Sequence, residues 1–196
     1  LFWPSKNIQL FYETAKEKIN FLNLKEENSN LMYIFENDKI KNILLKEISK
    51  KKIKIIRKEI NNLGELKKYD LSILCLGGNS EIYNKIINKR SINKDYKEVA
   101  ITGYIKHKFK RLNTSQFFLK EGPLAILPFS NNYFSFVWSI KKEFYKDNSK
   151  KINDLVKAKI LEILKTKKNI SITNIQSYPI SLDLKAQYHD KNILIL

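Results

Sequence analysis

Cysteine is nearly absent from this sequence, which has one, Cys75, in 196 residues. A single thiol cannot form an internal disulfide, and a zinc site built on cysteines is not expected. No run approaches the roughly 20 uninterrupted apolar residues that a membrane-spanning helix needs. The first residues, Leu1 to Pro4, lack the basic and then apolar order of a signal peptide. These absences favour a reducing compartment, and we expect the protein in the cytoplasm.

Arginine is also scarce, although the formal net charge is +17. Nearly all the positive charge is lysine, and the arginines are only Arg57, Arg90 and Arg111. Base readout and phosphate clamps favour the guanidinium fork, and the lysines are spread over the whole chain. Nucleic acid is therefore not an expected partner. Weak peripheral attraction to the anionic inner face of a membrane is the alternative that this charge favours.

Motifs of hydrolytic and metal chemistry are missing as well. His107 and His189 are far apart, and neither has a second ligand at metal spacing, so both are predicted at the surface or at strand ends. There is no G-x-S-x-G, P-loop or G-x-G-x-x-G, and no pair of carboxylates stands out as acid and base. Cys75 lies in an apolar run and is expected to be a buried, inert thiol. We predict no metal site and identify no catalytic side chain.

The first sixty residues predict one helix and one strand. Apolar residues recur at helical spacing from Ile40 to Lys50, so this segment is expected to be a helix. Asn37 or Asp38 is the expected cap, and lysines follow where positive charge stabilises a helix C-terminus. Ile53 to Ile56 is expected to be a short strand.

The middle of the chain changes to a period of two. Apolar residues alternate with small or polar ones from Val99 onward, and turn residues separate the segments, which argues an antiparallel meander. Its strands are expected near residues 99–105, 117–119, 124–128 and 133–140. Ser149 is the expected cap of a helix whose apolar stripe runs from Ile152 to Leu164.

Two apolar runs frame this middle part. Residues 70–76 end at a glycine pair, which is typical of a central strand buried on both faces. Residues 192–196 form a second strand-like run, and we expect the two runs to lie side by side in one sheet. The predicted fold class is α/β (α+β), with one domain inserted into another. Because the chain starts at Leu1 and stops inside a strand-like run, we expect an internal piece of a longer protein.

Several short segments carry a family resemblance. They are Cys75 to Ser80, Asp95 to Ala100, Gly122 to Pro128 followed by Val137-Trp138, and Tyr178 to Ile180. In this order they resemble the A-D-G-x-N-S, D-Y-x-x-V-A, G-P-L-A-x-L-P with V-W, and Y-P-L segments of FAD-dependent aromatic-ring monooxygenases of the p-hydroxybenzoate hydroxylase type. The most similar branch hydroxylates ubiquinone precursors. The resemblance covers roughly residues 30 to 196, and Gly122 to Pro128 with Val137-Trp138 is its most specific part.

The resemblance implies the roles of the two parts. Residues 1–92 and 178–196 would be a partial FAD/NAD(P)-binding Rossmann-like domain, and residues 93–177 a substrate-binding antiparallel sheet with one helix. The expected cofactor-binding residues are Leu76, Gly77, Gly78 and Asn42. The expected substrate pocket is lined by Leu124, Ile126, Pro128, Phe136 and Trp138, about half of which would face the pocket because the strand pleat alternates.

The implied activity is hydroxylation of a polyprenyl phenol, a ubiquinone precursor, with O2 and FAD reduced by NAD(P)H or another donor. Other ubiquinone-biosynthesis proteins would be partners. Leu76 stands where the family has an aspartate that handles the cofactor, and Asp38, Lys41 and Asn42 lie where relatives often carry Arg or Gln.

Two alternatives stay open: another FAD-fold oxidoreductase such as a prenyl reductase, and a basic module that binds nucleic acid or membrane. Because the family's pyrophosphate-binding segments lie outside this sequence, we expect the isolated chain to be inactive and to bind FAD weakly or not at all.

Overall fold

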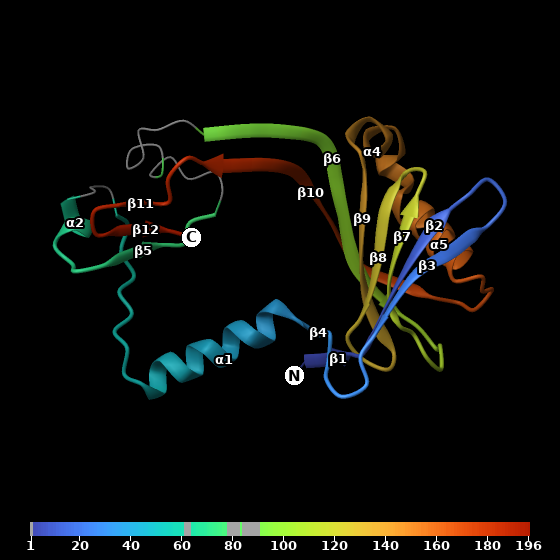
Figure 1. The fold of residues 1–196 in the computed structure, drawn as a ribbon, viewed down its shortest axis with the longest axis horizontal. Coiled ribbons are helices and arrows are strands. Elements are labelled where there is room, and N and C mark those ends of the chain that lie inside the picture. Colours follow the sequence, from blue (N-terminus) through green and yellow to red (C-terminus); the bar gives the residue numbers. More distant parts are fainter. Residues whose placement is uncertain (1, 61–63, 78–82, 84–90) are drawn as a thin grey trace. The chain divides into compact units, whose positions relative to one another are not determined.

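The structure is a computed structural model that describes residues 2–60, 64–77, 83 and 91–196 (Figure 1). The chain divides into two compact units. The first combines Leu1–Lys52 with Lys97–Ile180, and the second combines Ile53–Tyr96 with Ser181–Leu196. Each unit has its own sheet and its own buried core.

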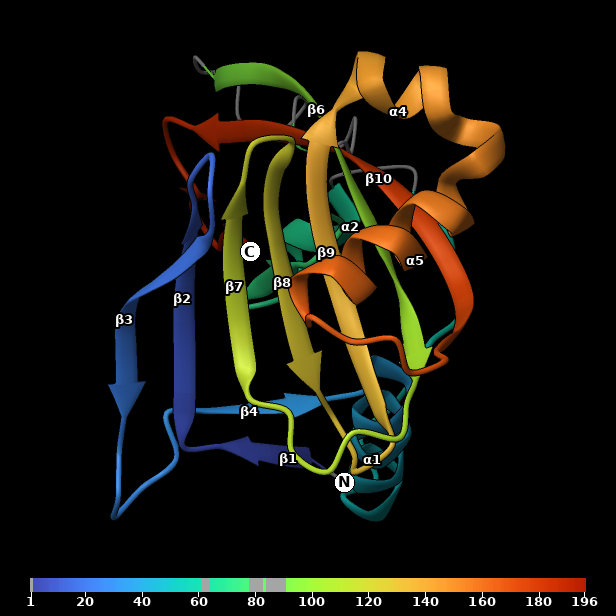
Figure 2. The ribbon, with the colours of Figure 1, turned by 90° about the vertical axis from the view of Figure 1, so that its right-hand side faces the viewer.

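A seven-stranded sheet forms the frame of the first unit (Figure 2). Its strands, in spatial order, are β10 (Ser171–Lys185), β6 (Ser91–Lys106), β9 (Tyr133–Lys141), β8 (Gly122–Pro128), β7 (Thr114–Leu119), β2 (Asn7–Glu13) and β3 (Lys18–Lys25). The pairs β6–β9, β9–β8 and β8–β7 are antiparallel, so the predicted antiparallel sheet is confirmed. The β2–β3 hairpin extends it through a parallel pairing of β2 with β7.

Helix α5 (Ile152–Ile163) lies across one face of this sheet (Figure 2). Alternate residues of β9 point to this face, and Phe134, Phe136 and Trp138 are fully buried there. Val156 and Ile160 of α5 complete the same core. Burying each such side chain contributes roughly 1.5–3 kcal/mol, so this face accounts for much of the stability of the unit.

Two glycines allow the strands to pair this closely. A Cβ on Gly103 would lie 2.9 Å from Cε1 of Phe136, whose ring covers that position. Gly122 has φ +134°, and a Cβ there would lie 1.9 Å from the carbonyl oxygen of Ser139. Both the backbone conformation and the lack of space for a Cβ therefore require glycine at position 122.

The helices begin differently from the predictions. Helix α1 (Asn37–Lys50) ends where expected, but its N-cap residue is Glu36 and no side chain caps it. Ser149 lies in a short 3-10 helix, η1 (Ser149–Lys151), which follows α4 (Lys142–Asn148). The Ser149 hydroxyl donates to the carbonyl of Lys146 at 3.1 Å instead of capping α5. Both predicted caps are wrong, because these short polar side chains face solvent or bond backwards.

The remaining strands of the first unit form a two-stranded ribbon. Strand β1 (Phe2–Ser5) pairs antiparallel with β4 (Met32–Phe35), which leads directly into α1. The ring of Phe2 meets that of Tyr33 edge-on, with centroids 5.0 Å apart. No residue of α1 is buried.

The second unit contains a three-stranded sheet in the order β11-β12-β5. Strand β12 (Ile193–Ile195) runs parallel to β5 (Ser72–Leu74), with Ile195 opposite Leu74, and antiparallel to β11 (His189–Asp190). The predicted side-by-side arrangement of residues 70–76 and 192–196 is confirmed. One face is covered by Leu66 of α2 (Gly64–Lys67) and by Tyr83.

Three expectations for this unit are wrong. Strand β5 is not buried on both faces, because the described residues cover one face and Ile73 is 51% exposed on the other. Cys75 is likewise exposed rather than buried. The expected strand at Ile53–Ile56 is irregular, and no strand in the described part of the chain pairs with it.

The observed division falls at other positions than the predicted one. Residues 1–52, predicted to belong with the cofactor-binding part, cluster with the large sheet because β2 and β3 extend it. The chain crosses between the units at 96/97 and 180/181, within β6 and β10, where we predicted 92/93 and 177/178. Within the described ranges, no helix has the length and apolar character needed to cross a membrane.

Candidate functional site

The candidate site is the outer face of the seven-stranded sheet, defined as the face opposite α5. Because side chains alternate along a strand, the neighbours of the core residues point outward here. They include Leu10, Tyr12, Thr102, Tyr104, Lys106, Gln116, Phe118, Ala125, Leu127, Tyr133, Ser135, Val137 and Ser139. All are exposed or half-buried, and most are apolar or aromatic. A contiguous apolar surface of this kind is typical of a ligand or partner site.

Three aromatic rings gather at one end of the outer face. The rings of Tyr104 and Phe129 meet edge-on at 5.4 Å, and Phe129 stacks with Tyr133 at 6.2 Å. They line a cavity of about 370 Å³ together with Glu36, Lys39, Ser130 and Thr173. The Glu36 carboxylate accepts a hydrogen bond from Lys39 Nζ at 2.5 Å. The cavity thus combines aromatic walls with a few polar groups, as small-molecule sites do.

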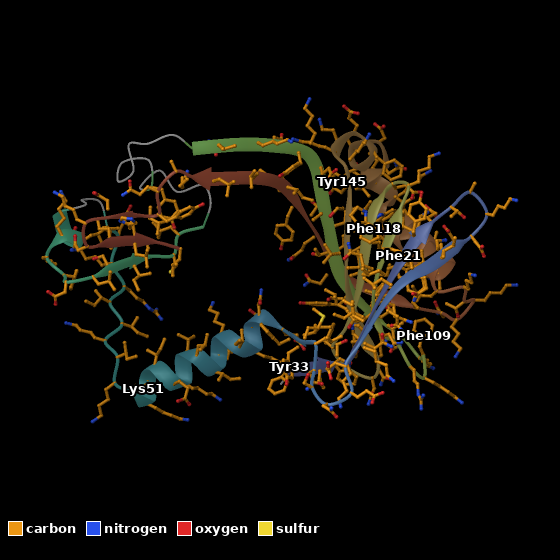
Figure 3. All side chains as sticks on the ribbon, in the orientation of Figure 1. Phe21, Tyr33, Lys51, Phe109, Phe118 and Tyr145 are labelled. Carbon is orange, nitrogen blue, oxygen red and sulfur yellow. The ribbon has the colours of Figure 1, made fainter. Side chains whose placement is uncertain are left out.

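A second aromatic pair lies at the other edge. The rings of Phe21 on β3 and Phe118 on β7 lie on either side of β2, with centroids 6.0 Å apart (Figure 3). Tyr12 lies opposite Phe118 in the β2–β7 register. Smaller side chains, among them Ala125 and Val137, occupy the strands between the two aromatic groups. A flat aromatic molecule could lie on this central part without meeting a bulky side chain.

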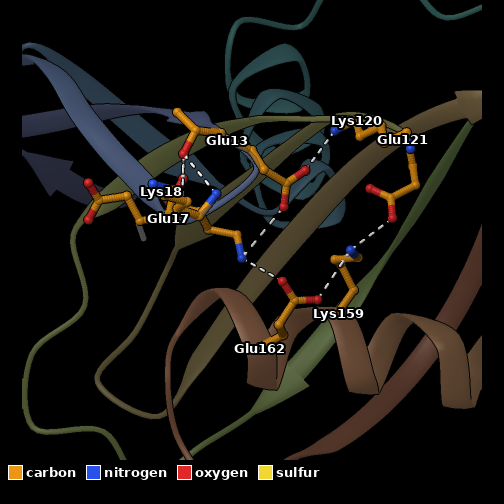
Figure 4. A network of polar contacts seen from close by, with 9 residues as sticks. Glu13, Glu17, Lys18, Lys120, Glu121, Lys159 and Glu162 are labelled. Atoms are coloured by element: carbon orange, nitrogen blue, oxygen red, sulfur yellow. Dashed lines mark hydrogen bonds and ion pairs between the residues drawn. The ribbon is translucent and has the colours of Figure 1, made fainter.

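An ion-pair network fixes the β2–β3 hairpin to α5 (Figure 4). Lys18 pairs with Glu162 at 2.5 Å and with Glu13 at 3.7 Å, and the Lys120 amide donates to Glu13 at 2.8 Å. The hydrogen bond from Lys18 lowers the pKa of Glu162.

Lys159 extends the network to the β7–β8 turn by pairing with Glu121 at 2.9 Å and Glu162 at 3.2 Å. Burial acts to lower the pKa of Lys159, but hydrogen bonds to these two carboxylates outweigh it and hold that pKa raised. The hairpin that carries Tyr12 and Phe21 is therefore held in place by several charges at once.

The predicted pocket residues all lie on the α5 side. Leu124, Ile126 and Pro128 are spaced by two on β8, and the register places Phe136 opposite Ile126 and Trp138 opposite Leu124. Cross-strand partners share a face, so the expected split between pocket and core is not found. All five are buried, and four belong to the core cluster with α5. None of them lines the 370 Å³ cavity.

The predicted cofactor residues belong to different units. Leu76 and Gly77 follow β5, where the Leu76 amide donates to the Tyr83 hydroxyl at 2.7 Å. Gly77 has φ +75°, and a Cβ there would meet nothing within 4 Å, so a ligand could approach the backbone closely. Gly78 lies outside the described residues, and Asn42 is exposed on α1 of the first unit. The backbone at Gly77 is therefore open, whereas the amide of Leu76 is already engaged.

Sequence reasoning missed the aromatic residues of the outer face. The signal was the same alternation that identified the core, because Tyr104 and Phe118 occupy the intervening positions of their strands. Phe129 and Phe21 gave no such signal, since they meet their partners only through the turn after β8 and the irregular β2–β3 pairing.

Comparison with known proteins identifies the fold but no close relative. No protein-family model and no curated protein matches the sequence. Three solved structures illustrate the similarity. The flavin-dependent halogenase CmlS matches 99% of this chain and 40% of its own at a TM-score of 0.74 and 11% identity. The flavin-dependent brominase Bmp2 matches 100% of this chain and 55% of its own at a TM-score of 0.69 and 11% identity.

The third is PqsL, a probable FAD-dependent monooxygenase from Pseudomonas aeruginosa, matched over 100% of this chain and 60% of its own at a TM-score of 0.67 and 9% identity. This chain thus spans between 40% and 60% of the lengths of these three structures. None of the three is described as a ubiquinone-biosynthesis hydroxylase, so that branch stays a prediction. The chain has the fold of part of the FAD-dependent halogenases and monooxygenases.

Proposed function

We propose that this chain is part of a flavin-dependent enzyme that oxygenates or halogenates an electron-rich substrate, and that the outer face of its large sheet is a wall of the reaction cavity. The observation that carries the proposal is the fold similarity to CmlS over 99% of the chain. The exposed and half-buried apolar and aromatic side chains on the outer face of the same sheet support the second half of the proposal.

The residues of the outer face would bind and orient the substrate. Bound and reduced FAD would supply the reaction with O2. Tyr104, Phe129 and Tyr133 would hold an aromatic ring by edge and stacking contacts, which are worth roughly 0.5–1.5 kcal/mol per pair. Leu127 and Val137 would exclude water from the surface beneath it.

A narrower form of the proposal is hydroxylation of a polyprenyl phenol on the way to ubiquinone. The apolar outer face would suit a long hydrocarbon tail. The Gly122–Pro128 segment contributes less to this choice than its sequence indicated. Gly122 is required by its contact with Ser139, and Leu124 and Ile126 belong to the core, so the segment reflects the fold more than the substrate.

Product analysis with the complete protein tests the proposal. The protein is incubated with FAD, a reductant, O2 and an alkylated phenol, with and without bromide, and the products are identified by mass spectrometry. Gain of one oxygen atom supports hydroxylation, and bromide-dependent gain of bromine supports halogenation. Reduction of a prenyl double bond without either change would favour the reductase alternative and contradict the proposal.

A matched pair of variants tests the outer face as the site. Val137→Trp fills the centre of this face, whereas Lys150→Trp adds the same ring to an exposed position on η1. We expect Val137→Trp to lower turnover about tenfold or more because it occupies the space of the substrate ring, and Lys150→Trp to leave turnover unchanged. Equal activity of both variants would exclude the outer face as the reaction wall.

A further inference from the structure

A second cavity, of about 600 Å³, shares no lining residue with the 370 Å³ cavity. It is lined by Lys106, His107, Lys108, Lys168, Asn169, Ile170 and Ser171. The first three are the last residue of β6 and the two that follow it, and the others are the first residue of β10 and the three that precede it. Three lysines and no acidic residue belong to this lining. The cavity therefore favours an anion.

His107 supplies the feature that makes this more than a positive patch. Its side chain is only 4% exposed, stacked on Phe109 at 4.8 Å and packed near Phe134 at 5.4 Å. The Phe109 amide donates to Nδ1 at 3.1 Å, so Nδ1 is the acceptor of the neutral ring and Nε2 carries the proton. Among the described residues Nε2 has no hydrogen-bond partner. A buried donor without an acceptor is costly and calls for a partner.

The lysines have few competing interactions, although the Lys106 ammonium lies over the Tyr133 ring, 6.0 Å from its centroid. Within the part of the chain that the structure describes, no ion pair involves Lys106, Lys108 or Lys168. The surrounding network uses other lysines, such as Lys18 and Lys159. The His107 ring is fixed in place by its neighbours, whereas lysine ammonium groups act as mobile point charges. Together they offer one directed donor and several charges to an oxyanion.

We propose that this cavity binds the phosphate group of a small soluble molecule, with His107 Nε2–H donating to a phosphate oxygen and Lys106, Lys108 and Lys168 balancing its charge. A doubly or triply charged phosphate or diphosphate matches three lysines better than a carboxylate does. The volume exceeds that of inorganic phosphate alone and lies in the range of small-molecule sites. A free ligand is favoured over a lipid headgroup because His107, which lines the cavity, is itself a buried residue.

This binding site does not depend on the proposed flavin chemistry. Its residues all belong to the first unit, and none of them lines the 370 Å³ cavity. Burial lowers the pKa of His107, so the ring is neutral at neutral pH and keeps its proton on Nε2. An approaching phosphate stabilises the additional positive charge and would raise that pKa again.

Calorimetric titration of the 196-residue chain with inorganic pyrophosphate at low ionic strength tests the proposal. His107→Phe keeps the ring and removes Nε2–H, and Lys108→Gln with Lys168→Gln removes two charges from the lining. We expect each to weaken binding about tenfold. The matched controls are His189→Phe, at an exposed histidine, and Lys150→Gln with Lys151→Gln, at exposed lysines of η1, which should bind as the unaltered chain does.

Two further measurements leave no outcome undecided. Nitrogen-15 NMR of the unaltered chain should show the His107 ring signals shifting on addition of pyrophosphate while those of His189 stay in place, which decides the matter even if His107→Phe does not fold. Vesicles containing phosphatidic acid should not displace pyrophosphate. The proposal of a soluble phosphate ligand would be overturned by any of four results. These are no binding of pyrophosphate, an equal loss of affinity in the two double lysine variants, an unmoved His107 signal, and displacement of pyrophosphate by the vesicles.

Discussion

The two faces of the seven-stranded sheet are built from the same strands but have opposite properties. The face under α5 is closed, with Phe136 and Trp138 fully buried. The outer face begins one residue away, and Val137, between those two, is only half-buried. The most recognisable family-like segments, Gly122–Pro128 and Val137-Trp138, contribute residues to both faces. The comparison teaches that the closed face determines the fold, whereas the outer face leaves its side chains open to a ligand.

The sharpest test of this difference uses two adjacent residues of β9. Trp138→Ala removes a fully buried ring and should lower the free energy of unfolding by about 3–5 kcal/mol. Val137→Ala removes two methyl groups from the half-buried outer position and should cost about 1 kcal/mol or less. Chemical denaturation of both variants measures the two losses. Similar values would show that the faces are not energetically distinct.

Two glycines extend the comparison to the backbone. Gly122→Ala should cost about 3 kcal/mol, because its Cβ would lie 1.9 Å from the Ser139 carbonyl oxygen and its φ of +134° is strained for alanine. Gly77→Ala should cost about 1 kcal/mol, because its φ of +75° is also strained but nothing lies within 4 Å of a Cβ. Denaturation midpoints of the two variants report the difference. A smaller loss for Gly122→Ala would mean that β8 and β9 can move apart.

The smallest expected effect concerns pH and the buried His107. Burial lowers its pKa in the folded state below the ordinary value near 6.5, so the unfolded chain binds the proton more readily. The contribution of neutral His107 to the free energy of unfolding is present above about pH 6.5 and is lost as pH falls through the folded-state pKa. The midpoint temperature of thermal unfolding should therefore decrease as the pH falls below that value. The decrease should be less steep for His107→Phe than for the unaltered chain. An identical pH dependence in the two proteins would contradict this assignment.

Much of the frame could be predicted because it depends on local periodicity. Alternation from Tyr133 to Ile140 identified β9 and its buried face, and the apolar runs at 70–76 and 192–196 identified the parallel pair of the second unit. The end of α1 at Lys50 was predicted for a similar reason. These features need only the sequence of one segment and the requirement to bury its apolar side.

The parts that could not be predicted depend on distant contacts. Strands β2 and β3 mix charged with apolar residues, and they join the sheet through a parallel pairing with β7, more than 100 residues away in sequence, that no local pattern indicates. His107 was predicted at the surface or a strand end. It does follow β6, but it is buried because Phe109 and Phe134 cover its ring. The second cavity joins residues 106–108 to residues 168–171, so neither segment alone indicates a site.

A crystal structure of the complete protein with FAD and an alkylated phenol bound tests the central claim most directly. The account predicts that the phenol ring packs on the outer face, in contact with Val137 and with the rings of Tyr104, Phe129 or Tyr133. A phenol bound elsewhere, with these side chains still facing solvent, would contradict the claim that the outer face is the wall of the reaction cavity.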